Sequence, residues 1–169
     1  MSEPQDNGLP PRVVGPDDGD FVDLGSLAVR FMVSSREAGG GFSMVEHPIP
    51  PRTLAAPLHR HSREDEYSYV LEGRMGAILG GKVVYANPGD LVFKPRDQWH
   101  TFWNAGDTPC RILEIISPGG FEQMFAEMGR NPEAFIGDAA AAMDARFGLE
   151  VDYASIDRLC QEHGLTFPE

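Results

Sequence analysis

Residues 57–73 read PLHRHSREDEYSYVLEG, and this stretch decides how the chain is expected to fold. His59 and His61 stand two positions apart, and Glu66 follows at the start of a run of residues that favour β-structure. Side chains alternate between the two faces of a strand, so the two imidazoles point the same way only where the backbone is extended. Two imidazoles that converge beside a carboxylate predict a metal site.

Short β-type runs separated by glycine and proline turns flank this stretch on both sides. They are expected at residues 21–24, 27–33, 42–47, 67–71, 75–79, 82–86, 91–94, 98–103 and 111–116. Gly80 and Gly81 predict a tight hairpin turn between two of them. Because no helical pattern is interleaved, the runs favour an antiparallel sandwich or jelly roll over a parallel sheet.

The pattern becomes helical after residue 117. Phe121, Met124, Phe125 and Met128 recur at helical spacing and form one apolar stripe. Further helices are expected at residues 138–147 and 155–163, where Gly148 and Gly164 provide the stop signals.

The chain is therefore expected to have three parts. Residues 1–20 lack periodicity and are rich in proline, glycine and aspartate, which predicts a flexible leader. Residues 21–117 form the β-barrel domain, and residues 118–169 form a helical appendage.

A second polar cluster lies on the later strands. Gly89 is followed by Pro95, His100 and Asn104, and His100 shares one face of its strand with Phe102. His100 can join His59 and His61 if the sheet folds back on itself.

These two clusters resemble the two motifs of the cupin superfamily, which are small β-barrels of jelly-roll type. The matching residues are His59, His61, Glu66 and Gly73 in the first motif and Gly89, Pro95, His100 and Asn104 in the second. The resemblance implies an all-β jelly-roll barrel whose metal ligands are His59, His61, Glu66 and His100. One position departs from the family pattern, because Asp97 stands where glycine is usual, and this could change the turn before His100.

The ligand set also has its own chemical logic. Neutral imidazoles with one carboxylate suit Fe, Ni, Mn, Co, Cu or Zn, so we expect one divalent transition metal whose identity the sequence leaves open. Glu66 is preferred to its neighbour Asp65 and to Glu64, the alternative ligand, because the distance from Glu66 to Gly73 fits the motif. Four protein ligands leave one or two positions for dioxygen, water or a substrate.

The whole chain resembles single-domain bacterial cupins of the quercetin-dioxygenase-like family. The resemblance implies a metal-dependent dioxygenase that acts on an aromatic or enolic, flavonol-like small molecule. Glu66 would then be both a ligand and the catalytic base, and Phe102 would give the substrate pocket an apolar wall. A non-oxidative isomerase or lyase, or a binding protein without turnover, is the alternative, because fold does not fix function.

Composition and charge limit the partners. The formal net charge of −12 argues against nucleic acid and anionic membranes. The sequence shows no signal peptide or membrane-length apolar segment, and its two cysteines form no CxxC pair, which predicts a cytoplasmic protein.

The family resemblance implies a homodimer. Tyr67, Tyr69 and Leu71 should share an outer face that either pairs with another subunit or packs under the leader or the C-terminal helices.

Overall fold

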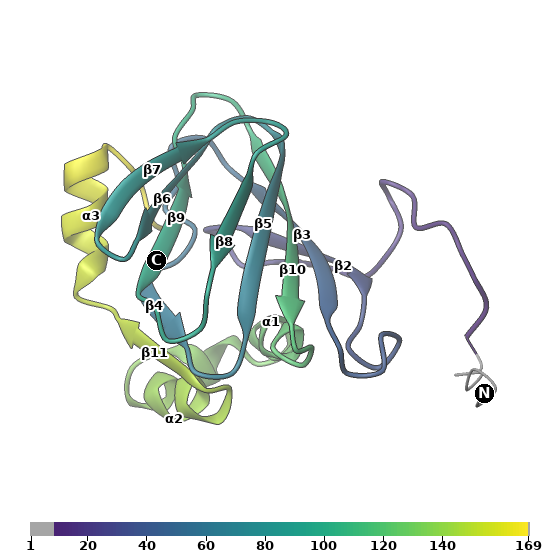
Figure 1. The fold of residues 1–169 in the computed structure, drawn as a ribbon. Helices are drawn as coiled ribbons and strands as arrows, with labels where there is room; N and C mark the ends of the chain where they lie inside the picture. The colour runs from purple at the N-terminus through teal and green to yellow at the C-terminus, as the bar shows by residue number, and fades with distance from the viewer. Residues whose placement is uncertain (1–8, 169) are drawn as a thin grey trace.

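The computed structural model describes residues 9–168, which form two antiparallel β-sheets facing one another (Figure 1). The larger sheet has the order β1 (Phe21–Asp23), β2 (Ala28–Val33), β3 (Ser43–Ile49), β10 (Cys110–Ser117), β5 (Asp65–Glu72) and β8 (Leu91–Lys94). The smaller sheet has the order β11 (Leu149–Asp152), β4 (Leu58–His61), β9 (His100–Asn104), β6 (Met75–Leu79) and β7 (Lys82–Ala86). The predicted all-β jelly-roll fold is confirmed.

Local sequence explains the sheet geometry. Gly80 and Gly81 have φ angles of 55° and 83°, as a tight turn between β6 and β7 requires. Along β10 every second side chain is buried, so Ile112 and Ile116 enter the space between the sheets while Leu113 and Ile115 face outwards. The main core fills that space.

The helices follow the barrel strands, as predicted. They are α1 (Glu122–Arg130), the 3-10 helix η1 (Pro132–Phe135), α2 (Asp138–Arg146) and α3 (Ser155–His163). Gly164 ends α3 in the left-handed conformation, with φ 63°. In Figure 1, α1 and α2 lie across one end of the barrel, whereas α3 lies along the smaller sheet.

Strand β11 is a departure from the purely helical appendage that the sequence predicted. It pairs along the whole of β4, from Leu149 opposite His61 to Asp152 opposite Leu58. On its other side β4 pairs with β9 at one position only, His59 opposite His100. Unpaired backbone groups are costly when buried, and β11 provides the backbone hydrogen bonds that the free edge of β4 would otherwise lack.

Strand β9 is buried on both faces. His100 and Phe102 face the barrel interior, while Trp103 belongs to a second core beneath α3. The members of that second core are Leu54, Trp103, Leu159 and Leu165. Gly76 leaves the room that the indole needs, since a Cβ added there would lie 2.2 Å from a Trp103 ring carbon.

Part of the expected leader contacts the barrel. The Arg30 guanidinium donates hydrogen bonds to the carbonyl oxygens of Gly15 and Asp18 at 3.0 and 3.1 Å. Residues 1–8 lie outside the described residues. The flexible leader and the domain boundaries at residues 21 and 118 stay predictions.

Both cysteines are free thiols, with Cys110 buried in the core. Among the described residues, every helix is too short or too polar to cross a bilayer. The cytoplasmic location stays a prediction.

Candidate metal centre

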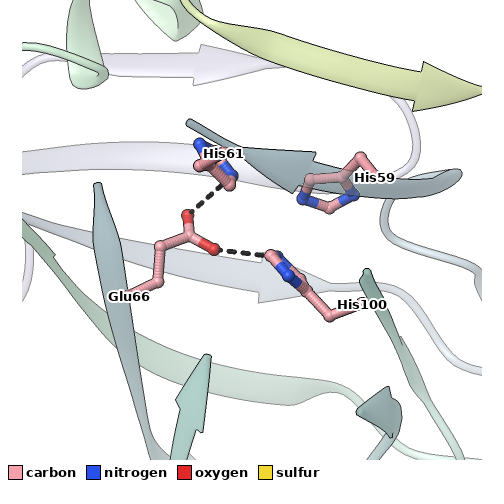
Figure 2. Close-up of side chains that lie close together, drawn as sticks. All are labelled: His59, His61, Glu66 and His100. Carbon is pink, nitrogen blue, oxygen red and sulfur yellow. Dashed lines mark hydrogen bonds and ion pairs between the residues drawn. The ribbon is translucent and has the colours of Figure 1, made fainter. Parts of the chain in front are cut away.

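The structure brings together the four side chains that the two motifs predicted. His59 and His61 come from β4, Glu66 from β5 and His100 from β9, and they project towards one another inside the barrel (Figure 2). All four residues are buried, and one potential ligand atom from each lies within 4.8 Å of all the others. Extended backbone at β4 makes this possible, because it places both imidazoles on the interior face.

Backbone carbonyls orient two of the imidazoles. The Nδ1–H of His59 donates to the Pro57 carbonyl at 2.7 Å, and that of His100 donates to the Gln98 carbonyl at 3.0 Å. Because a carbonyl only accepts hydrogen bonds, each Nε2 is left with its lone pair available. Burial lowers the pKa of both imidazoles, so they are held in the neutral form that binds metals.

Glu66 is the anionic member of the cluster. Its Oε2 lies 3.1 Å from His100 Nε2 and its Oε1 lies 3.5 Å from His61 Nε2, as the dashed lines in Figure 2 show. Burial by itself would raise the pKa of this carboxyl, but the Lys94 ammonium acts against burial, and the pKa lies well below its usual range. Glu66 is therefore a carboxylate at neutral pH.

Its neighbours point elsewhere. Asp65 turns outwards and forms an ion pair with Arg96 at 2.9 Å. Glu64 is buried, but its Oε2 lies 3.5 Å from Nδ1 of His61, on the opposite side of the ring from Glu66. The geometry thus favours Glu66 as the ligand and gives Glu64 the position of an outer carboxylate that can orient the His61 ring.

A buried lysine beneath the cluster was missed by the sequence analysis. Lys94 Nζ lies 3.0 Å from Glu66 Oε2 and 2.9 Å from Glu114 Oε1, and Ser68 donates to Glu114 Oε2 at 2.6 Å. The lysine side chain is fully buried, yet the two carboxylates raise its pKa against the effect of burial. Alternation could have placed Lys94 on the interior face, since it stands opposite Glu66 in the β5–β8 register.

Asp97 does not disturb the turn before His100. It adopts the left-handed region with φ 62°, which aspartate tolerates better than most residues, and its N–H donates to the His61 carbonyl at 2.7 Å. The turn that usually carries glycine is thus retained and is tied to the first motif.

A cavity of about 290 Å³ opens from the cluster towards the C-terminal appendage. His59, His61 and Glu66 line it together with Phe102, and residues of α1, η1, α2 and β11 form part of the remaining wall. The volume is close to the lower limit for small-molecule sites, and most of the wall is apolar. Phe102 therefore lies where the sequence placed it, although its contact with a substrate stays a prediction.

His47 also lines this cavity and was set aside by the motif comparison. Its Nδ1–H donates to the Ala28 carbonyl at 3.1 Å, which leaves Nε2 as an acceptor. Burial lowers the pKa of His47 to about 4, so the ring is neutral at physiological pH. His47 stands outside the four-residue cluster and adds a polar group to the cavity wall.

The four residues fit a divalent transition metal. Both ring nitrogens of His61 are buried without a hydrogen-bond partner in the described part of the chain, and metal coordination would satisfy one of them. Three neutral imidazoles and one carboxylate are the donors that such ions prefer. The identity of the metal stays open.

Comparison with known proteins agrees with this geometry. Residues 45–116, which contain all four cluster residues, match the family described as Cupin domain. The match, the jelly-roll topology and the position of the cluster support a cupin-type barrel.

Three relatives illustrate the range of this fold. Quercetin 2,3-dioxygenase of Bacillus subtilis is 26% identical over 130 residues, which cover 77% of this chain but 38% of that protein. The polyketide cyclase RemF from Streptomyces resistomycificus superposes with a TM-score of 0.55 at 26% identity, over 63% of this chain and 78% of RemF. KdgF from Halomonas sp. superposes with a TM-score of 0.59 at 16% identity, over 68% of this chain and 99% of KdgF, and shows the fold alone.

Replacing a cluster residue should abolish metal binding. For His59→Ala and Glu66→Ala we expect a large fall in the affinity for added Ni²⁺ or Co²⁺. It should exceed the roughly 10–100-fold loss that is typical when a residue hydrogen-bonded to a metal ligand is replaced. Elemental analysis after dialysis and titration with each ion measure this. His163→Ala, which changes a histidine outside the cluster, should bind as the wild type does. Full occupancy in both ligand variants would overturn the assignment.

Removing the Lys94 charge should destabilise the protein. Lys94→Met leaves Glu66 and Glu114 buried without their shared cation, and loss of one partner from a buried pair costs about 3–5 kcal/mol. Urea unfolding of the metal-free protein measures the change in the free energy of unfolding. Lys82→Met, at an exposed position in β7, should leave that free energy within about 0.5 kcal/mol of wild type.

A double variant tests whether the buried charge of Glu114 causes part of the loss. Adding Glu114→Gln to Lys94→Met removes one of the two carboxylates and should recover part of the lost stability, because less uncompensated charge remains buried. Equal losses in the single and double variants would show that the charge of Glu114 does not contribute to the loss.

Proposed function

We propose that this protein is a metal-dependent dioxygenase that acts on an aromatic or enolic small molecule. The observation that carries the proposal is the shared cavity, in which a polar His₃Glu cluster stands at one side of a largely apolar, aromatic wall. A ligand that fits such a cavity has an oxygen anion to present to the cluster and a flat hydrophobic body.

The chain contributes binding, orientation and exclusion of water. When bound, a divalent transition metal supplies a Lewis acid and, for redox-active ions, electrons for reaction with dioxygen. His59, His61, His100 and Glu66 would hold it. Glu66 lines the cavity and would accept a hydrogen bond, and then the proton, from the substrate hydroxyl.

Aromatic residues above the cluster support an aromatic substrate. The Phe121 ring lies 4.4 Å from the His61 ring and 5.4 Å from the Phe125 ring, both measured between centroids, and each pair meets edge to face. Phe102 closes another part of the wall. A planar ring held among these groups would displace water and leave the cluster in a dry environment.

The likeness to quercetin 2,3-dioxygenase supports the reaction class, and the flavonol quercetin indicates the kind of substrate. Because the chain spans 38% of that protein, the transfer of its activity is part of the proposal. A second candidate is a non-oxidative reaction on a polyketide-like aromatic compound, which the likeness to RemF favours. The metal cluster and the apolar cavity suit either candidate.

Oxygen consumption decides between the two candidates. Protein loaded with Fe²⁺, Mn²⁺, Co²⁺, Ni²⁺ or Cu²⁺ should consume dioxygen with at least one member of a panel of flavonols, catechols and enolic diketones, measured with an oxygen electrode. Glu66→Ala should reduce the rate by at least the roughly 10²-fold that general acid–base catalysis contributes.

Other results would point away from the dioxygenase. Conversion of a panel compound under nitrogen, followed by chromatography, would establish the non-oxidative reaction. Absence of oxygen uptake with every metal and every compound would contradict the dioxygenase proposal.

We also propose that the protein forms a homodimer through the outer face of the larger sheet. Cross-strand neighbours on β10, β5 and β8 place apolar side chains side by side there: Leu71, Leu113, Ile115, Tyr67, Tyr69, Leu91 and Phe93. Leu91 is 57% exposed and Phe93 is 49% exposed, so no described segment covers this face. A contiguous apolar surface of this kind is typical of protein–protein contacts. A small-molecule substrate, with no nucleic acid or membrane partner, remains our expectation.

A charge in this face should separate the subunits. Tyr69→Glu and Leu91→Lys place a charge at the proposed contact and should give a monomer, whereas the wild type should sediment as a dimer in analytical ultracentrifugation. Val83→Lys changes an exposed apolar residue on β7 of the other sheet and should remain dimeric. A monomeric wild type at tens of micromolar would refute the dimer.

A further inference from the structure

A buried carboxylate that is hydrogen-bonded to a tyrosine stands on the appendage side of the cavity, apart from the metal cluster. Asp144 lies on α2 and is 6% exposed, and Tyr153 follows β11. Both residues line the same cavity as His59, His61 and Glu66. The Tyr153 hydroxyl donates to Asp144 Oδ2 at 2.9 Å.

This hydrogen bond satisfies only half of the carboxylate. Asp144 Oδ1 is buried and has no hydrogen-bond partner among residues 9–168. Burial raises the pKa of Asp144, and burial together with the adjacent carboxylate raises the pKa of Tyr153. A buried acceptor without a partner is costly, so a hydrogen-bond donor that reaches Oδ1 would be stabilised there.

A purely structural role for Asp144 explains the hydrogen bond to its Oδ2 but does not explain why its Oδ1 is buried without a hydrogen-bond partner. The bond to Tyr153 ties α2 to the segment after β11, and one oxygen suffices for that tie. Asp138, at the exposed start of the same helix, faces solvent as helix carboxylates usually do. Asp144 differs because it is buried in the wall of a cavity whose nearby residues, such as Phe135 and Leu149, are apolar.

The number of free acceptors also indicates the kind of donor. An ammonium group carries three N–H donors and would leave two of them unpaired against an apolar wall, whereas a hydroxyl group carries one O–H donor. One free carboxylate oxygen matches one hydroxyl.

We propose that Asp144 is a specificity-determining residue that binds a hydroxyl group on the substrate's aromatic body, at a distance from the metal-binding oxygen. The inference rests on the proposed function for the other end of the ligand. It narrows the substrate class to hydroxylated aromatic compounds that have two separate polar ends: an enolic or phenolic oxygen for the His₃Glu cluster and a remote hydroxyl for Asp144 Oδ1. The hydrogen bond from Tyr153 occupies Oδ2.

Binding to zinc-loaded protein tests this without turnover, because Zn²⁺ is not redox-active. The probes are 3-hydroxyflavone, whose only polar groups are its adjacent hydroxyl and ketone, and derivatives that each carry one further hydroxyl on either ring. Dissociation constants from fluorescence titration should show at least one derivative binding roughly tenfold tighter than the parent, as one hydrogen bond to a charged group provides. Asp144→Leu should reduce this preference to less than about twofold while binding the parent as the wild type does.

Two further variants control for structure. Tyr153→Phe breaks the same hydrogen bond as Asp144→Leu but keeps Oδ1, so it should retain the preference for the hydroxylated derivative. Asp138→Leu removes an exposed carboxylate from the same helix and should behave as the wild type. Circular dichroism of each variant establishes that it is folded, and a preference lost equally in Tyr153→Phe would overturn the specific role of Oδ1.

The outcomes separate this inference from the proposed function. If a derivative binds in an Asp144-dependent way while the parent does not bind, the hydroxyl site stands and the metal-directed flavonol mode fails. Binding of the parent that depends on His59 would support the proposed function. The hydroxyl site is overturned, and the proposed function stands, if the parent binds in this way but Asp144→Leu keeps the wild-type preference for the derivative. The same conclusion follows if the wild type has no preference for any derivative. Absence of binding by every compound overturns both.

Discussion

The ion pair between Glu66 and Lys94, 3.0 Å apart in the middle of the barrel, is the interaction on which the site depends. A carboxylate buried among neutral histidines would be protonated if burial acted alone, and a protonated carboxyl is a poor metal ligand. Lys94 prevents this by lowering the pKa of Glu66, and Glu114 in turn keeps Lys94 charged. The barrel thus holds a preformed anion where a metal ion would bind.

The same pair joins the two motifs mechanically. Lys94 lies on β8 just before Pro95, and Glu66 lies opposite it on β5, so the second motif begins directly beside the carboxylate of the first. The Asp97 N–H then bonds to the His61 carbonyl, and His100 pairs with His59 across β4 and β9. Short backbone connections therefore fix the relative positions of all four cluster residues, which limits how far any of them can move without disturbing the sheets.

The appendage gives the site its chemical character. The barrel strands supply the polar cluster, while α1 and α2 lie across one end of the barrel and residues of α1, η1 and β11 form part of the apolar wall. β11 has two roles, because it pairs with the edge of β4 and turns Leu149 and Val151 into the cavity.

The sequence by itself determined the strand runs, the helical periods after residue 117 and the four clustered residues, because these depend on local alternation, local turns and motif spacing. It could not show that Lys94, Glu114 and Glu66 meet, that β11 completes the smaller sheet, or that Asp144 shares a cavity with His59. Each of these contacts joins residues far apart in the chain, and only the pairing of strands in the folded barrel decides which distant side chains become neighbours. Motif spacing predicted Glu66 rather than Glu64 as the ligand. Both carboxylates are buried beside His61, and the three-dimensional arrangement adds the physical reason: Glu66 lies with all three histidines, whereas Glu64 lies on the other side of the His61 ring.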